Sequence, residues 1–231
     1  TATLSPDGKY FVYALAEDQG QSLWVRQVSE SRSIQLLPAD AVEYWGLTFS
    51  PDNTQIYGTV FTAKQADPLL IRLPVLGGAV EELPNVSCSR VSFSPDGKRF
   101  AYVVSSSGSG GTLLRTANAD GSHDKVLSIL KDPSYFVFPG ATVAWSPDGQ
   151  TIAAAAKIVD ETGDYGAVMQ IRIADGSMSP VAMRRFPRIE SVIWTPKGDG
   201  LIVTANDDAG SPDQIWYQSI GGAEAVRLNN D

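Results

Sequence analysis

The sequence predicts an all-β protein built from repeated four-stranded units, and three observations support this prediction. A turn motif recurs at nearly regular intervals, each copy is followed by the same succession of apolar runs, and several of these runs have no polar face. The chain has 231 residues, which permits one large domain. Its apolar fraction of 43% is that of a globular protein with a real core.

The turn motif is typified by Ser94-Pro95-Asp96-Gly97. Its copies are spaced by 45, 44, 52 and 49 residues and begin at Ser5, Ser50, Ser94, Ser146 and Thr195. A bulky apolar residue precedes each copy: Leu4, Phe49, Phe93, Trp145 and Trp194. Proline presets φ for a type I turn, and the hydroxyl bonds back to the turn backbone. The fourth position needs positive φ, which suits Gly and also Asn53, so each copy predicts a β-hairpin.

Apolar runs of strand length follow every turn in the same order. The first runs cover residues 10–15, 56–61, 100–104, 151–156 and 201–205, and the second runs cover 23–28, 69–75, 112–117, 168–173 and 214–220. A last strand follows, for example at 34–37, 79–83 or 223–228. With the strand before the turn, each repeat holds four strands. Residues 122–130 also fit a short helix, but their phase in the repeat predicts a fourth strand.

Runs such as 10–15 and 151–156 are apolar almost throughout, which indicates that both faces of the sheet are covered. Four-stranded antiparallel units of about 45 residues with both faces buried describe the blades of a β-propeller. We expect a single propeller domain over residues 1–231, with five blades at about 1–38, 39–84, 85–131, 132–183 and 184–231.

Ring closure is open between two interpretations. Residue 1 falls in an innermost strand and 223–228 in an outermost one, so the two ends of the chain do not share a blade. Five blades close directly on each other, or the chain is a fragment of a larger ring or protein. The sequence of residues 227–231 is typical of a blade-to-blade junction and favours a fragment. Its exposed blade faces would then be apolar and inclined to self-associate.

The Ser-Pro-Asp-Gly turns, the run at 98–103 and the later "ADGS" turns at 119–122 and 174–177 resemble the WD-repeat-like blades of TolB-type bacterial propellers. The resemblance covers the whole chain. Among such propellers, the sequence is most similar to those attached to bacterial serine/threonine kinases and winged-helix regulators. It implies a sensor or interaction domain. TolB-type rings typically have six blades, whereas five are visible here.

Composition and motifs exclude several classes of function. The net charge of −8 argues against binding to nucleic acid, and no apolar stretch is long enough for direct membrane insertion. There is no G-x-S-x-G motif, and the single histidine, His123, lies in a turn-like segment. We therefore expect no enzymatic activity, no cofactor and no metal site. Calcium ligation by the acidic segments 160–164 and 206–213 is the alternative to solvated loops.

Partner binding is expected on the long loops between strands and blades, since rigid scaffolds carry function on loops. Aromatic and arginine side chains, which interface hot spots favour, gather in the blade-to-blade loops at Tyr44, Trp45, Arg90, Tyr135, Phe136, Arg184, Arg185 and Arg188. The hypothesis is a channel rim that binds a protein, an acidic peptide or a small anionic ligand. In the alternative, the aromatic rings pack between blades and the arginines pair with acids such as Glu43 or Glu190.

The function predicted from the sequence is a non-catalytic binding module, the sensor or scaffold part of a larger bacterial signalling protein. Two alternatives remain. The first is the gating propeller of an oligopeptidase-like hydrolase, and the second is a TolB-like scaffold in the periplasmic envelope. An extracytoplasmic location is favoured over a cytoplasmic one.

Overall fold

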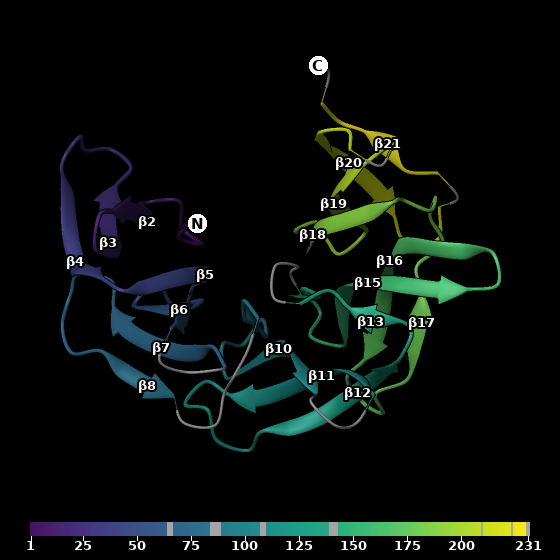
Figure 1. Cartoon of the computed structure of the whole chain (residues 1–231), viewed down its shortest axis with the longest axis horizontal. Helices are drawn as coiled ribbons and strands as arrows, with labels where there is room; N and C mark the ends of the chain where they lie inside the picture. The colour runs from purple at the N-terminus through teal and green to yellow at the C-terminus, as the bar shows by residue number, and fades with distance from the viewer. Residues whose placement is uncertain are drawn as a thin grey trace.

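A computed structural model describes residues 1–63, 67–83, 89–106, 110–138, 143–208, 210–222 and 224–229. In these residues the regular structure is all β, and five antiparallel sheets follow one another along the chain. Figure 1 shows them arranged as blades around a common centre. The predicted fold, an all-β propeller with five four-stranded blades, is confirmed.

The strands of each blade follow the chain from the centre outward. Blade 1 holds β1 (Ala2–Leu4), β2 (Tyr10–Glu17), β3 (Gly20–Gln27) and β4 (Ser33–Asp40). Blade 2 holds β5 (Val42–Phe49), β6 (Gln55–Thr62), β7 (Leu69–Pro74) and β8 (Glu81–Leu83). Blade 3 holds β9 (Ser92–Phe93), β10 (Arg99–Ser106), β11 (Gly111–Asn118) and β12 (Lys125–Lys131).

In blade 4 two short strands share the innermost position, because both pair with the same long strand. They are β13 (Tyr135–Phe136) and β14 (Val143–Trp145), and the blade continues with β15 (Thr151–Asp160), β16 (Gly163–Arg172) and β17 (Met178–Pro180). Blade 5 holds β18 (Arg188–Trp194), β19 (Gly200–Asn206), β20 (Asp213–Ser219) and β21 (Val226–Arg227). Of the segment with two sequence interpretations, 122–130, residues 125–130 lie in β12, so the strand interpretation is the correct one.

The recurring turns have the predicted geometry. The fourth residue has positive φ in every copy, including φ of 61° at Asn53. In the third copy the Ser94 hydroxyl accepts from the Arg99 amide at 3.0 Å and donates to Asp96 at 2.6 Å. The bond from the Ser94 hydroxyl, and then that from the Lys98 amide, lower the pKa of the Asp96 carboxyl. In the fifth copy, where lysine replaces the aspartate, Thr195 donates instead to Asp199 at 2.6 Å.

The core lies between adjacent sheets rather than in one centre. Ile152 and Ala154 face blade 3, while Ala153 and Ala155 on the other side of β15 pack against blade 5; none is more than 2% exposed. Small side chains let the neighbouring sheets approach closely on both faces, which explains the continuous apolar run.

Blade 1 and blade 5 lie at the two ends of an arc (Figure 1). Leu4, at 54% exposed, is on the face of blade 1 opposite to Val12, which packs against blade 2. On blade 5, Ile215 and Val226 are 43% and 56% exposed. The outer faces of the two end blades therefore present apolar side chains to solvent.

Candidate functional site

The propeller has two faces that differ in their connections. The Ser-Pro-Asp-Gly hairpins, which join the first and second strands of each blade, define what we call the turn face. The loops between the second and third strands and the loops between blades lie at the opposite ends of the strands and define the loop face. Sequence reasoning assigned the binding site to the loop face, and the structure has a cavity at each.

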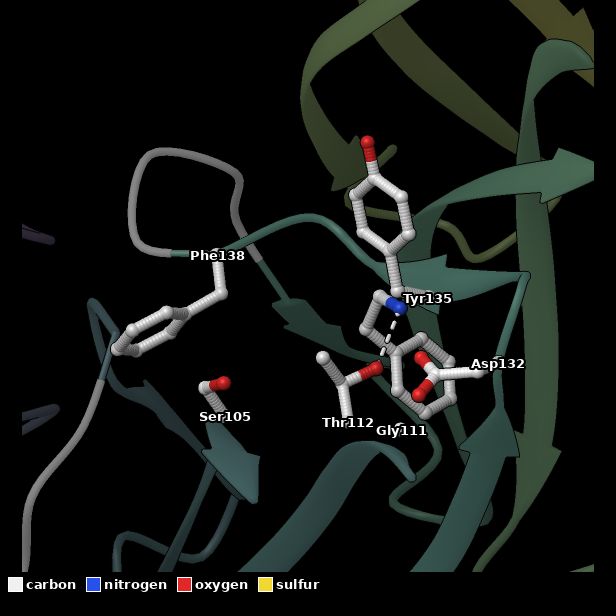
Figure 2. Close-up of a pocket in the computed structure, with 7 residues that line it drawn as sticks. Ser105, Gly111, Thr112, Asp132, Tyr135 and Phe138 are labelled. Carbon is white, nitrogen blue, oxygen red and sulfur yellow. Dashed lines mark hydrogen bonds between the residues drawn. The ribbon is translucent and has the colours of Figure 1, made fainter. Parts of the chain in front are cut away.

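The cavity on the loop face lies beside β13 and has a volume of about 270 Å³. Its lining comes from blade 3 and the loop that follows it: Ser105, Gly111, Thr112, Asp132, Tyr135, Phe136 and Phe138. Figure 2 shows Phe138 and Asp132 on either side of Thr112, while Tyr135 extends away from the lining. The lining thus combines one carboxylate, from Asp132, with the aromatic ring of Phe138.

Adjacent aromatic residues in this loop have opposite environments. Phe136 is fully buried, and its amide donates to Thr112 Oγ1 at 2.6 Å. Tyr135, next to it, is 41% exposed. Because successive side chains of a strand point to opposite faces, burial of Phe136 fixes Tyr135 outward. Phe136 thus anchors this segment, and Tyr135 is exposed to solvent.

The sequence predicts Tyr44 and Trp45 in the first blade-to-blade loop, but both lie within β5, because this strand already begins at Val42 and pairs with β6. Tyr44 is 6% exposed, and burial raises the pKa of its phenol to about 12. The Trp45 ring stacks on Phe61 with centroids 4.8 Å apart, and its Nε1 donates to Glu43 at 3.2 Å. Cys88, in the second loop, lies outside the described residues.

The arginine loop, residues 184–188, is held by acidic groups from neighbouring hairpins. Arg184 lies 2.9 Å from Asp207, and its guanidinium is 4.9 Å and 4.8 Å from the ring centroids of Phe186 and Trp216. Phe186 is 1% exposed and meets Trp216 edge to face. Arg184 therefore covers a buried aromatic pair while its charge is compensated.

The other two arginines of this loop are also paired. Arg185 donates to Thr162, lies over the Tyr165 ring and is 3.8 Å from Asp160. Arg188 contacts Glu190 at 2.5 Å. The acidic segment 160–164 thus supplies a partner to the arginine loop, and Asp164 pairs with Lys157 at 2.6 Å. The Arg188–Glu190 pair is one that the alternative interpretation of the sequence named, whereas Glu43, its other named acid, accepts from Trp45.

Arg90 differs from all three. It lies just before β9, the innermost strand of blade 3, and its side chain reaches blades 1 and 2. Its Nε donates to Thr48 Oγ1 at 3.3 Å, and its Nη2 donates to Thr3 Oγ1 at 3.1 Å. No ion pair joins it to a carboxylate in the described part of the chain, and burial lowers the pKa of its guanidinium. Gly46 makes room for it, because a Cβ there would lie 2.7 Å from the Arg90 Cβ.

A second cavity, the channel cavity, has a volume of about 400 Å³ and draws its lining from all five blades. Its walls are mainly apolar, and four exposed turn prolines place its mouth on the turn face: Pro6, Pro51, Pro147 and Pro196. Sequence reasoning missed this cavity. The signal was in the repeat itself, since the aromatic residues before the turns of blades 2 to 5 and the turn prolines of blades 1, 2, 4 and 5 line this cavity.

His123 lies in a tight turn with φ of 53°. Its Nδ1 is 2.9 Å from Asn118 Nδ2 and 3.1 Å from Ser122 Oγ. The side chains that the structure places contain no group of three potential metal ligands. Nor do the described segments include a helix long and apolar enough to cross a membrane.

Comparison with known proteins gives structural matches only. No family model matches the chain, and no curated protein matches its sequence. TolB from Acinetobacter baumannii superposes with a TM-score of 0.74 at 17% identity, over 99% of this chain and 54% of that one. An oligogalacturonate lyase from Vibrio parahaemolyticus matches with a TM-score of 0.69 at 13% identity, over 98% of this chain and 64% of the lyase.

Peptidases are also among the similar structures. The structure of a prolyl endopeptidase matches with a TM-score of 0.62 at 13% identity, over 100% of this chain and 36% of the peptidase chain. The chain thus spans about half of the TolB chain it matches and about a third of the peptidase chain. At these identities the likeness shows the fold alone, which is that of a TolB-like β-propeller.

Proposed function

We propose that this propeller is a non-catalytic binding module that recognises a protein or peptide on its loop face, as the sensor or scaffold part of a larger bacterial signalling protein. The observation that carries the proposal is the exposed Tyr135 beside the cavity lined by Asp132 and Phe138. Exposed aromatic side chains on a rigid frame are the groups that contribute most to protein interfaces.

Two features support recognition at this place. The frame is rigid, because Phe136 is fully buried directly beside Tyr135. The neighbouring Lys157, which pairs with Tyr135 in the sheet register, is itself bound to Asp164 and to the Pro187 carbonyl. The rim between the cavity and the arginine loop is therefore preorganised, which reduces the entropy lost on binding.

The test is site-specific photocrosslinking in the cell that makes the protein. A photoreactive phenylalanine replaces Tyr135, and the matched control carries it at Lys98 on the turn face, which is also exposed. The proposal expects a discrete crosslinked partner from position 135 that is absent from position 98. No discrete product from position 135, or the same products from both positions, would overturn it.

A second candidate is the gating propeller of an oligopeptidase-like hydrolase, which the match to prolyl endopeptidases favours. The intact mass of the polypeptide in its native cell separates the two. A mass near 24.7 kDa would exclude an attached hydrolase domain, and a larger polypeptide with a nucleophile-elbow motif would support gating.

We also propose that the chain self-associates through the outer faces of blades 1 and 5. Ile215 on blade 5 and Val226 beside it are exposed on the same face. In sedimentation velocity experiments the sedimentation coefficient should increase with protein concentration, and Ile215→Lys should reduce this increase. Val126→Lys on β12 is the matched control, since Val126 and Ile215 are both 43% exposed. Equal behaviour of the two variants would contradict this interface.

A further inference from the structure

The starting point is the charge of Arg90. Burying a cation is costly unless a carboxylate or several hydrogen bonds compensate it. Arg90 is half-buried and has two hydroxyl partners, Thr3 and Thr48, where the arginines of the arginine loop each have a carboxylate. Hydroxyl groups orient a guanidinium but do not neutralise it, so the site keeps a net positive charge.

The placement of Arg90 is specified by three blades. Thr3 and Thr48 occupy the same repeat position, the residue before the bulky apolar residue that precedes the turn. Gly46 lies beside Arg90 on the neighbouring strand, where a Cβ would come within 2.9 Å of the Arg90 Cα. A guanidinium has five N–H donors; the two hydroxyls occupy two of them, and the other three have no partner among the residues that the structure describes.

The channel cavity supplies the other half of the site. Arg90 is the one charged residue in its lining, as far as the structure describes the residues around it. The walls are formed largely by aromatic and proline side chains, among them Phe49, Phe93 and Trp194. Its volume of about 400 Å³ falls within the range of small-molecule sites. One cation in an apolar cavity selects a ligand with one negative charge and an apolar body.

We propose that the channel cavity binds a ligand that carries a single carboxylate on an apolar body, with Arg90 as the anion contact. Arg matches the geometry of a carboxylate through paired N–H donors. Two sources offer this chemistry: a free aromatic or aliphatic carboxylic acid, and the C-terminal carboxylate of a peptide that ends in apolar residues. The site is distinct from the loop-face cavity, so this proposal and the proposed function fail separately.

The experiment is isothermal titration calorimetry of the whole chain with two pairs of probes, each pair being a carboxylic acid and the corresponding uncharged amide. The probes are 4-phenylbutyrate and 4-phenylbutanamide for the small-molecule source, and N-acetyl-leucyl-phenylalanine and its C-terminal amide for the peptide source. At least one acid should bind with a dissociation constant of about 1 mM or tighter, and its amide at least about tenfold more weakly. The pair that shows this preference identifies the source.

Arg90→Gln should remove the preference for the acid, while Lys98→Gln, which removes an exposed cation on the same face, should keep it. Arg90→Lys should retain part of it and covers the case in which the Gln variant fails to fold. Binding of neither acid, equal binding of acid and amide, or an undiminished preference in a folded Arg90→Gln variant would overturn the proposal.

Discussion

The arginine loop and Arg90 show two uses of the same side chain in one molecule. Arg184, Arg185 and Arg188 stand close together in the sequence and on the surface, yet each has a carboxylate partner from its own or a neighbouring hairpin. Arg90 stands alone in the sequence, is half-buried and meets only hydroxyls among the described residues. Clustering of arginines in sequence is therefore a poor guide to available positive charge.

The difference follows from how blades meet. Carboxylates of the loop-face hairpins, such as Asp160 and Asp207, reach the arginine loop from adjacent hairpins. The residues that line the channel cavity are, apart from Arg90, apolar or hydroxyl-bearing. A cation at the rim is neutralised by the fold, and a cation in the channel is left for a ligand.

The largest expected effect is on the anchor of the arginine loop. Phe186→Ala removes a ring that is 1% exposed and packs on Trp216 and Arg184. We expect a loss of about 3–5 kcal/mol in the free energy of unfolding, measured by urea denaturation. A loss below about 1 kcal/mol would mean that the loop is not fixed by this ring, and the contrast with Arg90 would weaken.

Arg184→Met should have an effect of intermediate size on the free energy of unfolding, and it tests one arginine of the arginine loop for comparison with Arg90. The variant keeps the apolar stem but loses the Asp207 pair and the contacts with two aromatic rings. The pair is partly exposed, so we expect a loss of about 1–2 kcal/mol in the same denaturation experiment. A neutral result would show that the arginine is not held in this place.

Arg90→Met should behave in the opposite way. Loss of two hydroxyl contacts is offset by removal of a half-buried charge, so we expect the free energy of unfolding to stay unchanged or to rise by about 1 kcal/mol. Thr48 keeps its bond to the Val91 carbonyl at 3.0 Å. A loss above about 1 kcal/mol would mark Arg90 as a structural residue.

The smallest effect is the pH response of the arginine loop. The Thr162 hydroxyl and amide, then the Tyr165 hydroxyl and last Arg185, hold the pKa of Asp160 below its usual value. A lowered folded-state pKa means that this stabilisation is complete above about pH 4 and is lost as the pH falls through the folded-state pKa. In a carboxyl NMR titration, Thr162→Ala should raise the pKa of Asp160 more than Arg185→Met does. The reverse order would assign the main role to Arg185.

The sequence predicted the fold because the turn motif and apolar runs within each repeat are enough to predict the strands of that repeat. The fourth turn position requires positive φ, which Gly and Asn accept, and the five copies fix five hairpins in one register. The site was less predictable. Tyr135 and Phe136 are equivalent in sequence, and only the strand pairing of β13 decides which is buried. The partners of Arg184 and Arg185 lie about 23 and 25 residues away, on other hairpins, so no local pattern reveals them.

The most direct test of the difference between the two regions is an NMR titration of the arginine Nε–H signals with 4-phenylbutyrate. The signal of Arg90 should shift saturably, while those of Arg184, Arg185 and Arg188 stay in place because carboxylates already compensate the charges of these three guanidinium groups. A saturable shift of the arginine-loop signals with none at Arg90 would contradict the account and return the anion site to the loop face.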